Sequence, residues 1–508
     1  MTKAGPLPLR SQPATDAPGQ GGGAAPFPAE ADEKERERLE QWRRLIQACL
    51  PFADAASTEL PLRRLLRLSL FQVSCGMAAV LLTGTLNRVM IVELGVPAWL
   101  VALMVSLPLV FAPLRALIGF KSDTHRSYFG WRRGPYIWFG SLMQFGGLAI
   151  MPFALLLLSG QGNGPAWLGQ AAAALAFLLV GAGLHTAQTA GLALATDLAP
   201  EARRPRVVAL LYVMLLVGML VSAFVLSALL ADFNPLRLIQ VIQGAAVAAM
   251  ALNLVAMWKQ EAPDLALTAP ERERPQFRDA WADFMAGGRA GRLLAAVGLG
   301  AAAFSMQDVL LEPYGAQVLG LSVGATTALT GLWALGALGA FLLSAPQLAK
   351  GAEPHRLAAF GALIGIFAFV LAVLSAPLAS VLLLEIGVFA IGFGGGLFSV
   401  GVLIAAMELA GEGKGAGLAL GAWGAVQATC AGLGIAVGGA LRDLVSELAL
   451  AGRFGEALAL PATGYSFVYH LEIALLFATL IVIGPLARHS VRGRSPAPGG
   501  FGLAEFPT

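Results

Sequence analysis

The residues of this chain that could do chemistry are ionisable side chains inside long apolar segments. Arg88 lies in the first such segment, and Asp308 and Glu312 lie in the seventh. A charge at the centre of a membrane helix costs about 2.5–3.5 kcal/mol on insertion scales, so such residues usually serve a function. At 1.5 Å per residue, Arg88 sits roughly 30 Å beyond the start of its segment, near the outer face. We predict that Arg88 pairs with Asp308 or Glu312 and closes the outer side of a helix bundle; exposure of each to outer water is the alternative.

The fourth apolar segment contains His185 in GAGLHTAQTAG, with Gln188 one turn further on. An imidazole in hydrocarbon can ligate the magnesium of a chlorin. Gly181 and Gly183 would leave room there for a flat macrocycle. A histidine hydrogen-bonded between helices is the alternative. His470, at the start of the last segment, is a second candidate ligand.

The sequence shows no catalytic constellation. It has no Walker loop, no paired-histidine metal site, and no serine or cysteine nucleophile motif. The cysteines Cys49, Cys75 and Cys430 are too few and too scattered for a disulfide framework or a thiolate metal site. We therefore expect neither an enzyme nor a resident metal. The net charge of +3 does not indicate nucleic-acid binding, because the basic residues sort by membrane side.

Composition identifies the environment that must hold these residues. The chain has 508 residues, of which 57% are hydrophobic and 13% charged, and its mean hydropathy is +0.72. A soluble protein has about 25% charged residues. Runs of about 20 apolar residues cross a bilayer as helices. We predict an all-α membrane protein with twelve transmembrane helices near residues 66–92, 97–119, 135–158, 166–195, 207–231, 236–258, 293–312, 323–348, 356–376, 378–405, 415–440 and 466–487.

Basic residues distinguish the two sides of the membrane. Most of the 34 Lys and Arg residues fall in the tails and in alternate loops, which by the positive-inside rule places both termini in the cytoplasm. The longest connection divides the spans six and six. The predicted parts are a disordered tail (1–29), an amphipathic interfacial helix and linker (30–65), an N-terminal half (66–258), a cytoplasmic linker (259–292), a C-terminal half (293–488) and a cytoplasmic tail (489–508). Docking of a partner is the alternative role for the helix within 30–65.

The loop between the second and third spans, within GFKSDTHRSYFGWRRGPYIWFGSLMQ, is dense in cations and aromatic residues. It is a variant of the Gly-x-x-x-Asp…Gly-Arg-Arg loop of major facilitator transporters. In those proteins the loop aspartate docks at the N-terminus of the eleventh helix, which attracts a carboxylate. An ordinary basic topogenic loop is the alternative. The residues of this predicted cytoplasmic latch are Gly119, Asp123, Arg126, Arg132 and Arg133.

The two halves also repeat each other. ATDLAPEARR, after the fourth span, aligns with AMELAGEGKG, after the tenth. Residues 87–91 of the first span align more weakly with residues 307–311 of the seventh. Parallel six-helix repeats are the architecture of major facilitator proteins. The charged matches pair Asp197 with Glu408, Glu201 with Glu412, and Arg203 with Lys414.

Four stretches resemble a known family. They are LRLSLFQVSCGMAAVLLTGTLNRVMIVELG, KSDTHRSYFGWRRGPYIWFGSLMQFGGLAIMPFALLLLSG, ATDLAPEARRPRVVALLYVMLLVGM and FVYHLEIALLFATL. The chain resembles the PucC/LhaA family, the bacteriochlorophyll delivery branch of the major facilitator superfamily. The stretch PFADAASTELPLRRLLRLSLFQ is more similar to LhaA, which assembles the core antenna, than to PucC, which serves the peripheral antenna.

The resemblance implies an assembly factor for light-harvesting complexes in the photosynthetic membrane of purple bacteria. It implies that the protein hands bacteriochlorophyll to the antenna α and β polypeptides as these insert, with carotenoid as a second candidate cargo. The reaction centre and the bacteriochlorophyll synthesis machinery are further candidate partners. Two other functions stay open: a secondary transporter that moves a small solute by alternating access, and a chaperone of antenna helices that binds no pigment.

Overall fold

The long apolar runs of the chain fold into helices, because a backbone inside a bilayer must satisfy its own hydrogen bonds. The computed structural model describes residues 55–57, 60–110, 130–159, 165–200, 203–263, 289–349, 351–411 and 416–493. All of them belong to one unit, Pro51–Thr508. The tail predicted for residues 1–29 and the helix predicted within 30–65 lie largely outside the described residues, as does most of the linker predicted for 259–292.

The described residues contain ten helices that are long and apolar enough to cross a membrane. A bent pair of helices makes an eleventh candidate span, and the shorter apolar helix Ala98–Leu109 lies at the position of the predicted second span. Ten spans, the bent pair and the short helix together occupy the twelve predicted positions. The predicted all-α membrane class is therefore confirmed.

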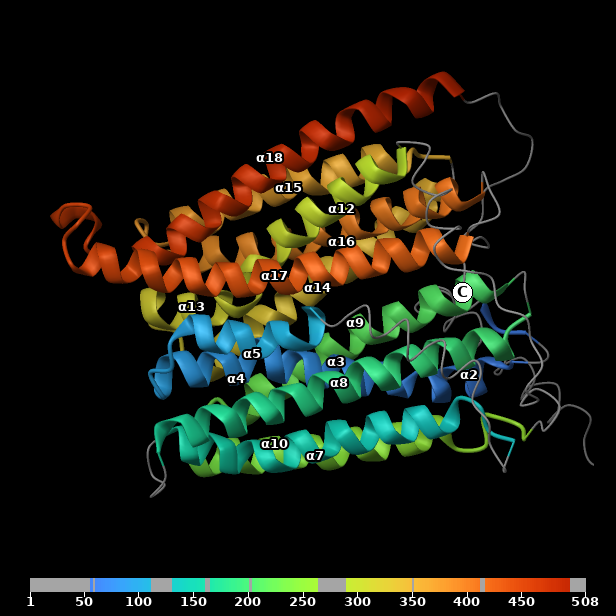
Figure 1. Ribbon diagram of the computed structural model, residues 1–508, viewed down its shortest axis with the longest axis horizontal. Helices are drawn as coiled ribbons and strands as arrows, with labels where there is room; N and C mark the ends of the chain where they lie inside the picture. The colour runs from blue at the N-terminus through green and yellow to red at the C-terminus, as the bar shows by residue number, and fades with distance from the viewer. Residues whose placement is uncertain are drawn as a thin grey trace, which may run out of the picture. The chain divides into compact units, whose positions relative to one another are not determined.

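The elements follow the chain as consecutive helices, and Figure 1 shows those of the predicted C-terminal half on one side of those of the N-terminal half. In order they are α2 (Leu62–Leu68), α3 (Leu70–Ala79), η2 (Val80–Thr85), α4 (Leu86–Arg88), η3 (Val89–Glu93), α5 (Ala98–Val110), α7 (Gly134–Leu158), α8 (Ala166–Leu198), α9 (Arg204–Leu229), α10 (Pro235–Met257), α12 (Arg289–Ser305), η5 (Met306–Val309), α13 (Leu311–Leu319), α14 (Val323–Ala349), α15 (Pro354–Ser375), α16 (Val381–Gly411), α17 (Ala416–Leu450), η6 (Glu456–Leu458) and α18 (Ala462–Gly493).

The first span, Leu62–Glu93, is continuous but irregular. Its segments η2 and η3 are π-helical, with α4 between them. A π-turn holds one residue more than an α-turn and is found most often at functional sites. Successive side chains in the outer part of this span therefore point in directions that differ from those of a regular α-helix.

The seventh span is broken. α12 ends at Ser305, the 3₁₀ turn η5 follows, and α13 continues at an angle of 45°. Gly320 ends α13 in the left-handed conformation, with φ of 68°, which glycine adopts without a Cβ clash. Each of the two weakly matching patches of the predicted repeat thus includes part of a turn that is not α-helical: η3 in residues 87–91 and η5 in residues 307–311.

Glycine brings neighbouring helices into backbone contact. A Cβ added at Gly140 of α7 would lie 2.6 Å from the amide nitrogen of Ala187 on α8. A Cβ at Gly361 of α15 would lie 2.5 Å from the carbonyl oxygen of Gly394 on α16. Small residues at such crossings are how membrane helices gain van der Waals contact.

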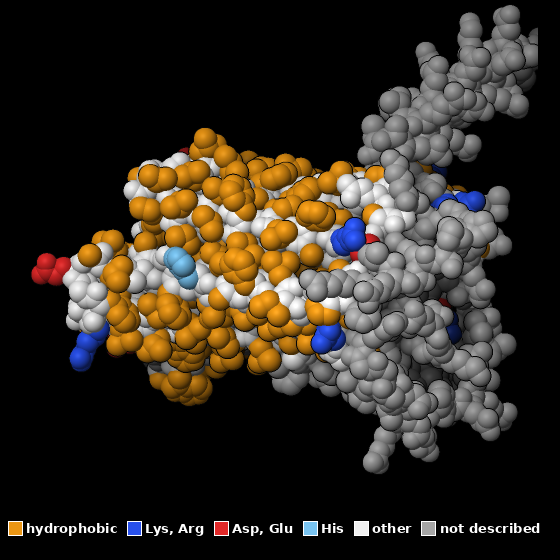
Figure 2. Space-filling model, turned by 90° about the horizontal axis from the view of Figure 1, so that it is seen from above, with side chains coloured by type: hydrophobic (Ala, Val, Ile, Leu, Met, Phe, Trp, Pro, Cys, Tyr) orange, Lys and Arg blue, Asp and Glu red, His pale blue; other side chains and the backbone are white. Residues whose placement is uncertain are grey.

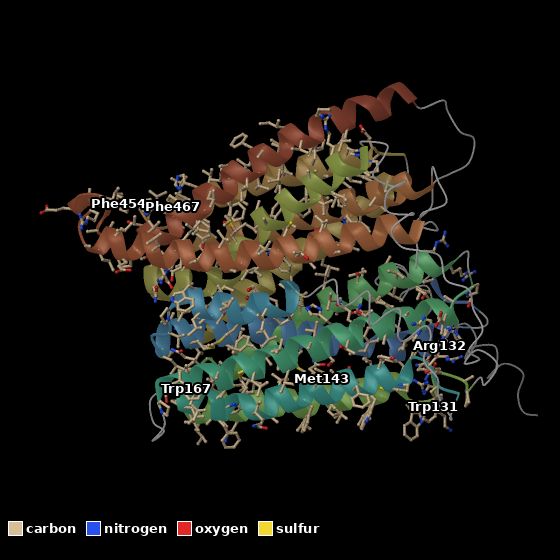
Figure 3. All side chains as sticks on the ribbon, viewed as in Figure 1. Trp131, Arg132, Met143, Trp167, Phe454 and Phe467 are labelled. Atoms are coloured by element: carbon tan, nitrogen blue, oxygen red, sulfur yellow. The ribbon has the colours of Figure 1, made fainter. Side chains whose placement is uncertain are left out.

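The outer surface matches a bilayer. Hydrophobic side chains cover the middle of the face seen in Figure 2, and charged side chains appear towards its ends. Trp131 and Arg132 lie at one end of the bundle and Trp167 at the opposite end (Figure 3). The two tryptophans are 45% and 64% exposed. Tryptophans at both ends of an apolar band are typical of the two membrane–water boundaries.

The α7–α8 contact gives a stability prediction. Gly140→Ala should lower the free energy of unfolding in detergent by about 1–3 kcal/mol, because the added methyl group meets backbone that cannot move aside. Gly146→Ala, on the same helix, is the matched control, since a Cβ there meets nothing within 4 Å. Thermal unfolding of the purified variants measures both. Equal midpoints for the two variants would contradict the packing described here.

Candidate functional site

The first and seventh spans meet at the bend of the seventh. Asn87 Nδ2 donates a hydrogen bond to the backbone carbonyl of Asp308 at 3.3 Å. A Cβ at Gly84 would overlap Glu312 Oε1. The lack of a side chain at Gly84 therefore lets the first span approach a carboxylate of the seventh. The two weakly matching patches, 87–91 and 307–311, thus contain residues that contact each other.

Glu312 is held in this contact by threonines of α14. Its side chain is buried, with 1% of the residue exposed. Thr330 Oγ1 donates a hydrogen bond to Glu312 Oε1 at 2.6 Å. Next to it, Thr85 Oγ1 of the first span lies 3.1 Å from Thr327 Oγ1. A glutamate, threonines of two spans and a glycine thus form one polar contact between the halves.

Arg88 does not form the predicted ion pair with Asp308 or Glu312. Its guanidinium instead pairs with Glu93, five residues further along the same span. The intervening π-turn explains this, because a π-helix relates residues five apart in the way an α-helix relates residues four apart. Arg88 is nevertheless buried, at 5% exposed, and its charge still acts on Glu312. The alternative, in which Arg88 faces outer water, is also wrong.

The sequence analysis missed a third acid, Glu472 of α18. It is fully buried, and neither of its carboxylate oxygens has a well-formed hydrogen bond. It lies beside the backbone of Gln307 and close enough to Asp308 for their charges to interact. The signal was available, since Glu472 is an acid inside an apolar span, where charge is costly.

Tyrosines connect this region to the end of the bundle. The rings of Tyr465 and Tyr469 on α18 pack edge-on against Tyr314, with centroids 5.4 and 5.3 Å away. Tyr465 Oη donates to Gln317 Oε1 at 2.7 Å. Arg442 on α17 donates to Tyr465 Oη at 2.9 Å and lies over its ring, 4.4 Å from the centroid. These contacts fix α13, α17 and α18 to one another.

At the other end of the bundle, two sets of predicted residues meet. Arg132 Nη2 lies 2.6 Å from Asp197 Oδ2, and Arg133 Nε lies 3.0 Å from the same oxygen. The sequence placed the arginines in the loop latch and Asp197 in the repeat-related loop after the fourth span. The structure brings them together as one ion-pair cluster between the start of α7 and the end of α8.

The first turn of α7 is capped from a distance. Glu261 follows α10, and its Oε1 accepts hydrogen bonds from the backbone amides of Arg132 and Arg133 at 2.6 and 2.9 Å. Its Oε2 accepts from the amide of Gly134 at 2.7 Å. A carboxylate at a helix N-terminus satisfies orphan amides and complements the helix dipole. The sequence analysis did not single out Glu261.

Several predicted residues lie outside the described part of the chain, so the docking predicted for the loop aspartate stays a prediction. Arg203 is described, and it donates to the carbonyl oxygen of Ala56. Glu408 lies on α16, and its side chain is outside the description. The residues not described are Gly119, Asp123, Arg126, Glu201, Glu412 and Lys414.

His185 and Gln188, the residues predicted to hold a chlorin, both lie on α8, and their binding of a pigment stays a prediction. Gln188 is buried and donates to Gln72 Oε1 at 3.3 Å, while His185 is half-buried. A Cβ at Gly181 would meet Pro108, and one at Gly183 would meet backbone of α7. The room expected beside these glycines is filled by neighbouring helices. A macrocycle held by His185 would therefore have to lie away from both glycines.

Within the described residues, no group of three or more His, Cys, Asp or Glu side chains could hold a metal ion. The polar side chains around the bend of the seventh span are acids, amides and hydroxyl groups.

Relatives with known names identify the family of this fold. A family model described as PUCC protein matches residues 85–491. The chain belongs to the PucC family. A family relative from Rhodobacter capsulatus, named "Uncharacterized protein in puhA-bchM intergenic region", is 56% identical over 470 residues, which cover 91% of this chain and 98% of that one.

Two further relatives carry informative names. "Protein PucC" of Rhodovulum sulfidophilum is 58% identical over 402 residues, 78% of this PucC-family chain and 88% of its own. The "Bacteriochlorophyll synthase 44.5 kDa chain" of Rhodobacter capsulatus is 29% identical over 447 residues, 85% of this chain and 96% of its own. These organisms are photosynthetic bacteria, and the chain is a multi-pass membrane protein of that group.

Solved transporter structures share the fold. A bacterial homolog of the human lysosomal transporter Spinster aligns with a TM-score of 0.62 and 16% identity, over 85% of this PucC-family chain and 98% of that one. The nucleoside transporter NupG, as a point mutant, aligns with a TM-score of 0.60 and 14% identity, over 83% of this chain and 99% of that one. The chain therefore has the major facilitator fold, as the sequence predicted.

The Arg88–Glu93 pair gives a second prediction. In a double-mutant cycle of Arg88→Gln and Glu93→Gln, the two changes should interact by about 0.5–3 kcal/mol, because they remove the same contact. Thermal unfolding in detergent measures the cycle. A parallel cycle of Arg88→Gln with Asp308→Asn should give a smaller coupling energy than the cycle with Glu93→Gln. A larger coupling energy between Arg88 and Asp308 would support the pairing predicted from sequence.

The cap of α7 gives a third prediction. Glu261→Ala should cost about 0.5–2 kcal/mol of stability, the range for losing an N-terminal cap. Glu447→Ala removes an exposed acid from α17 and serves as the control. Amide hydrogen exchange at the first turn of α7 is the direct measurement. Unchanged exchange there in Glu261→Ala would contradict the capping role.

Proposed function

We propose that this protein is an assembly factor for bacterial light-harvesting complexes that delivers bacteriochlorophyll to antenna α and β polypeptides in the membrane. The observation that carries the proposal is membership of the PucC family over residues 85–491. The relative named as a bacteriochlorophyll synthase chain supports a link to that pigment. The photosynthetic membrane is the corresponding location.

The fold is compatible with such a role. Its outer surface carries large apolar side chains, among them Phe153 at 66% exposed and Phe367 at 62% exposed. These side chains face lipid, the medium in which antenna helices and pigments meet. Bacteriochlorophyll is the cargo in this proposal, and carotenoid is a second candidate cargo.

His185 is the candidate residue for holding the pigment. A neutral imidazole in an apolar setting can supply the axial ligand of a chlorin magnesium. Since Gly181 and Gly183 are packed against other helices, only the face of α8 that carries His185 is available for this contact. The protein's own task would be to orient the pigment and to exclude water from its metal.

The antenna that the protein would serve is either the core antenna or the peripheral antenna. The identities of 56% over 470 residues and 58% over 402 residues do not separate a core-antenna from a peripheral-antenna factor. Resemblance of the segment before the first span favours the core antenna, with the reaction centre and the pigment synthesis machinery as neighbours.

A secondary transporter is the second candidate function. The major facilitator fold and the buried acids near the bend of the seventh span favour it. A chaperone that binds antenna helices without pigment is the third, and the same lipid-facing surface would serve it.

The fourth prediction tests pigment delivery. Protein purified in mild detergent from a photosynthetic host lacking all antenna polypeptides should contain near-stoichiometric bacteriochlorophyll. His185→Phe should lose that pigment, and His470→Phe, which changes an exposed histidine of α18, should keep it. Absorption spectra and pigment extracts are the measurements.

Each outcome selects a function. Pigment retained in His185→Phe would keep delivery and reject the proposed ligand. Colourless wild-type protein that copurifies with antenna polypeptides from a wild-type host would favour the pigment-free chaperone. Colourless protein without antenna polypeptides would favour the transporter.

A further inference from the structure

Buried acceptor atoms without a donor gather around the bend of the seventh span. They are Glu472 Oε1 and Oε2, Glu312 Oε2, Gln307 Oε1 and Asn87 Oδ1. The large majority of buried polar side-chain atoms in proteins have a hydrogen-bond partner, so such a group needs an explanation. Acceptors without donors call for a ligand that brings hydrogen-bond donors or positive charge.

The nearby positive charge does not balance these acids. Glu472 and Glu312 are 0% and 1% exposed, and Asp308 is half-buried. Arg88 acts on Glu312 from the first span, but its guanidinium is paired with Glu93. Glu472 has Asp308, another acid, as its charged neighbour.

A proton relieves this arrangement. An unpaired carboxylate in a low-dielectric interior loses its hydration and becomes neutral by binding a proton. Of two neighbouring carboxylates, the second resists ionisation because like charges repel, so the pair retains one proton. Protonation also turns one carboxylate oxygen into a hydrogen-bond donor, which the surrounding acceptors lack.

The ligand must also be small. Glu472, Gln307 and Asn87 are each 0% or 1% exposed. The described residues contain no group of three or more His, Cys, Asp or Glu side chains that could hold a metal ion. A proton needs no cavity and no coordination shell, so it suits a buried pair of acids.

We propose that Glu472 and Asp308 form a proton-binding pair, placed where the first span packs against the seventh. The step is the uptake of H⁺ from water by a carboxylate, without oxidation or reduction. Asp308, the less buried of the two, exchanges the proton with water, and Glu472 retains it. Asn87 of the first span bonds to the backbone of Asp308, so the pair lies at a contact between the halves. This inference does not depend on the proposed function.

The surroundings of the pair contain few other ionisable groups. The side chains that α14 contributes are threonines. Arg292 lies near the first turn of α12, and His355 and Arg356 lie in the first turn of α15. Glu385 lies on α16, and His470 of α18 is exposed. The charged and titratable side chains that face the pair's region from the elements around it are Arg88 and Glu93 of the first span, Glu312 and Tyr314 of α13, Arg442 and Asp443 of α17, and Tyr465 and Tyr469 of α18.

Infrared difference spectroscopy on the full-length protein in detergent tests the proposal. Acid-minus-alkaline spectra in H₂O and D₂O should show a deuterium-sensitive carbonyl band of a protonated carboxyl group at neutral pH. Glu472→Gln should lose this band. Glu447→Gln, an exposed acid of α17 in the same half, should keep it.

Asp308→Asn tests the pair itself and does not depend on whether Glu472→Gln folds. Without the neighbouring charge, Glu472 should ionise more easily, so the midpoint of its band should move to lower pH. The proposal is overturned if the wild-type protein has no such band, if the band survives in Glu472→Gln, or if Asp308→Asn leaves its midpoint unchanged. The titration is also repeated with Na⁺ in place of choline as the buffer cation. A shift in the midpoint of the carboxyl band between the two buffers would also overturn the proposal and assign the site to a metal cation.

Discussion

The cost of burying charge in an apolar bundle governs the core of this protein. Arg88 is tolerated because Glu93 follows it across a π-turn of the same helix. Glu312 is tolerated because Thr330 donates to it and Gly84 leaves space for it. The irregular turns of the first and seventh spans are therefore linked to the charges they hold, and the contact between the halves is polar where most of the bundle is apolar.

The spans themselves follow from local physics, so the sequence was enough to place them. Apolar runs of sufficient length must become helices in a bilayer. The ends were harder to predict: α17 continues to Leu450, about three turns beyond the predicted 415–440, because residues 441–450, LRDLVSELAL, contain charges yet are mostly good helix formers. Hydropathy detects the bilayer boundary, whereas the helix ends where its hydrogen bonds end.

The site was harder to predict, because its pairings depend on backbone details that a regular helix does not have. Opposite charges at repeat-equivalent positions suggested that Arg88 pairs across the halves, whereas the π-turn of its own span places it against Glu93. Glu472 was within reach of the rule that intramembrane acids are functional, yet its neighbour Asp308 is 164 positions away in the chain (472 − 308) and is brought close only by the fold. Asp197 likewise meets two arginines of a distant loop.

The cap that Glu261 places on α7 has a mechanical consequence. Glu261 lies just after α10, at the point where the chain leaves for the connection between the halves. Its carboxylate accepts hydrogen bonds from the backbone amides of Arg132, Arg133 and Gly134. A displacement of Glu261 would therefore also disturb the first turn of α7, next to the ion pairs of Asp197.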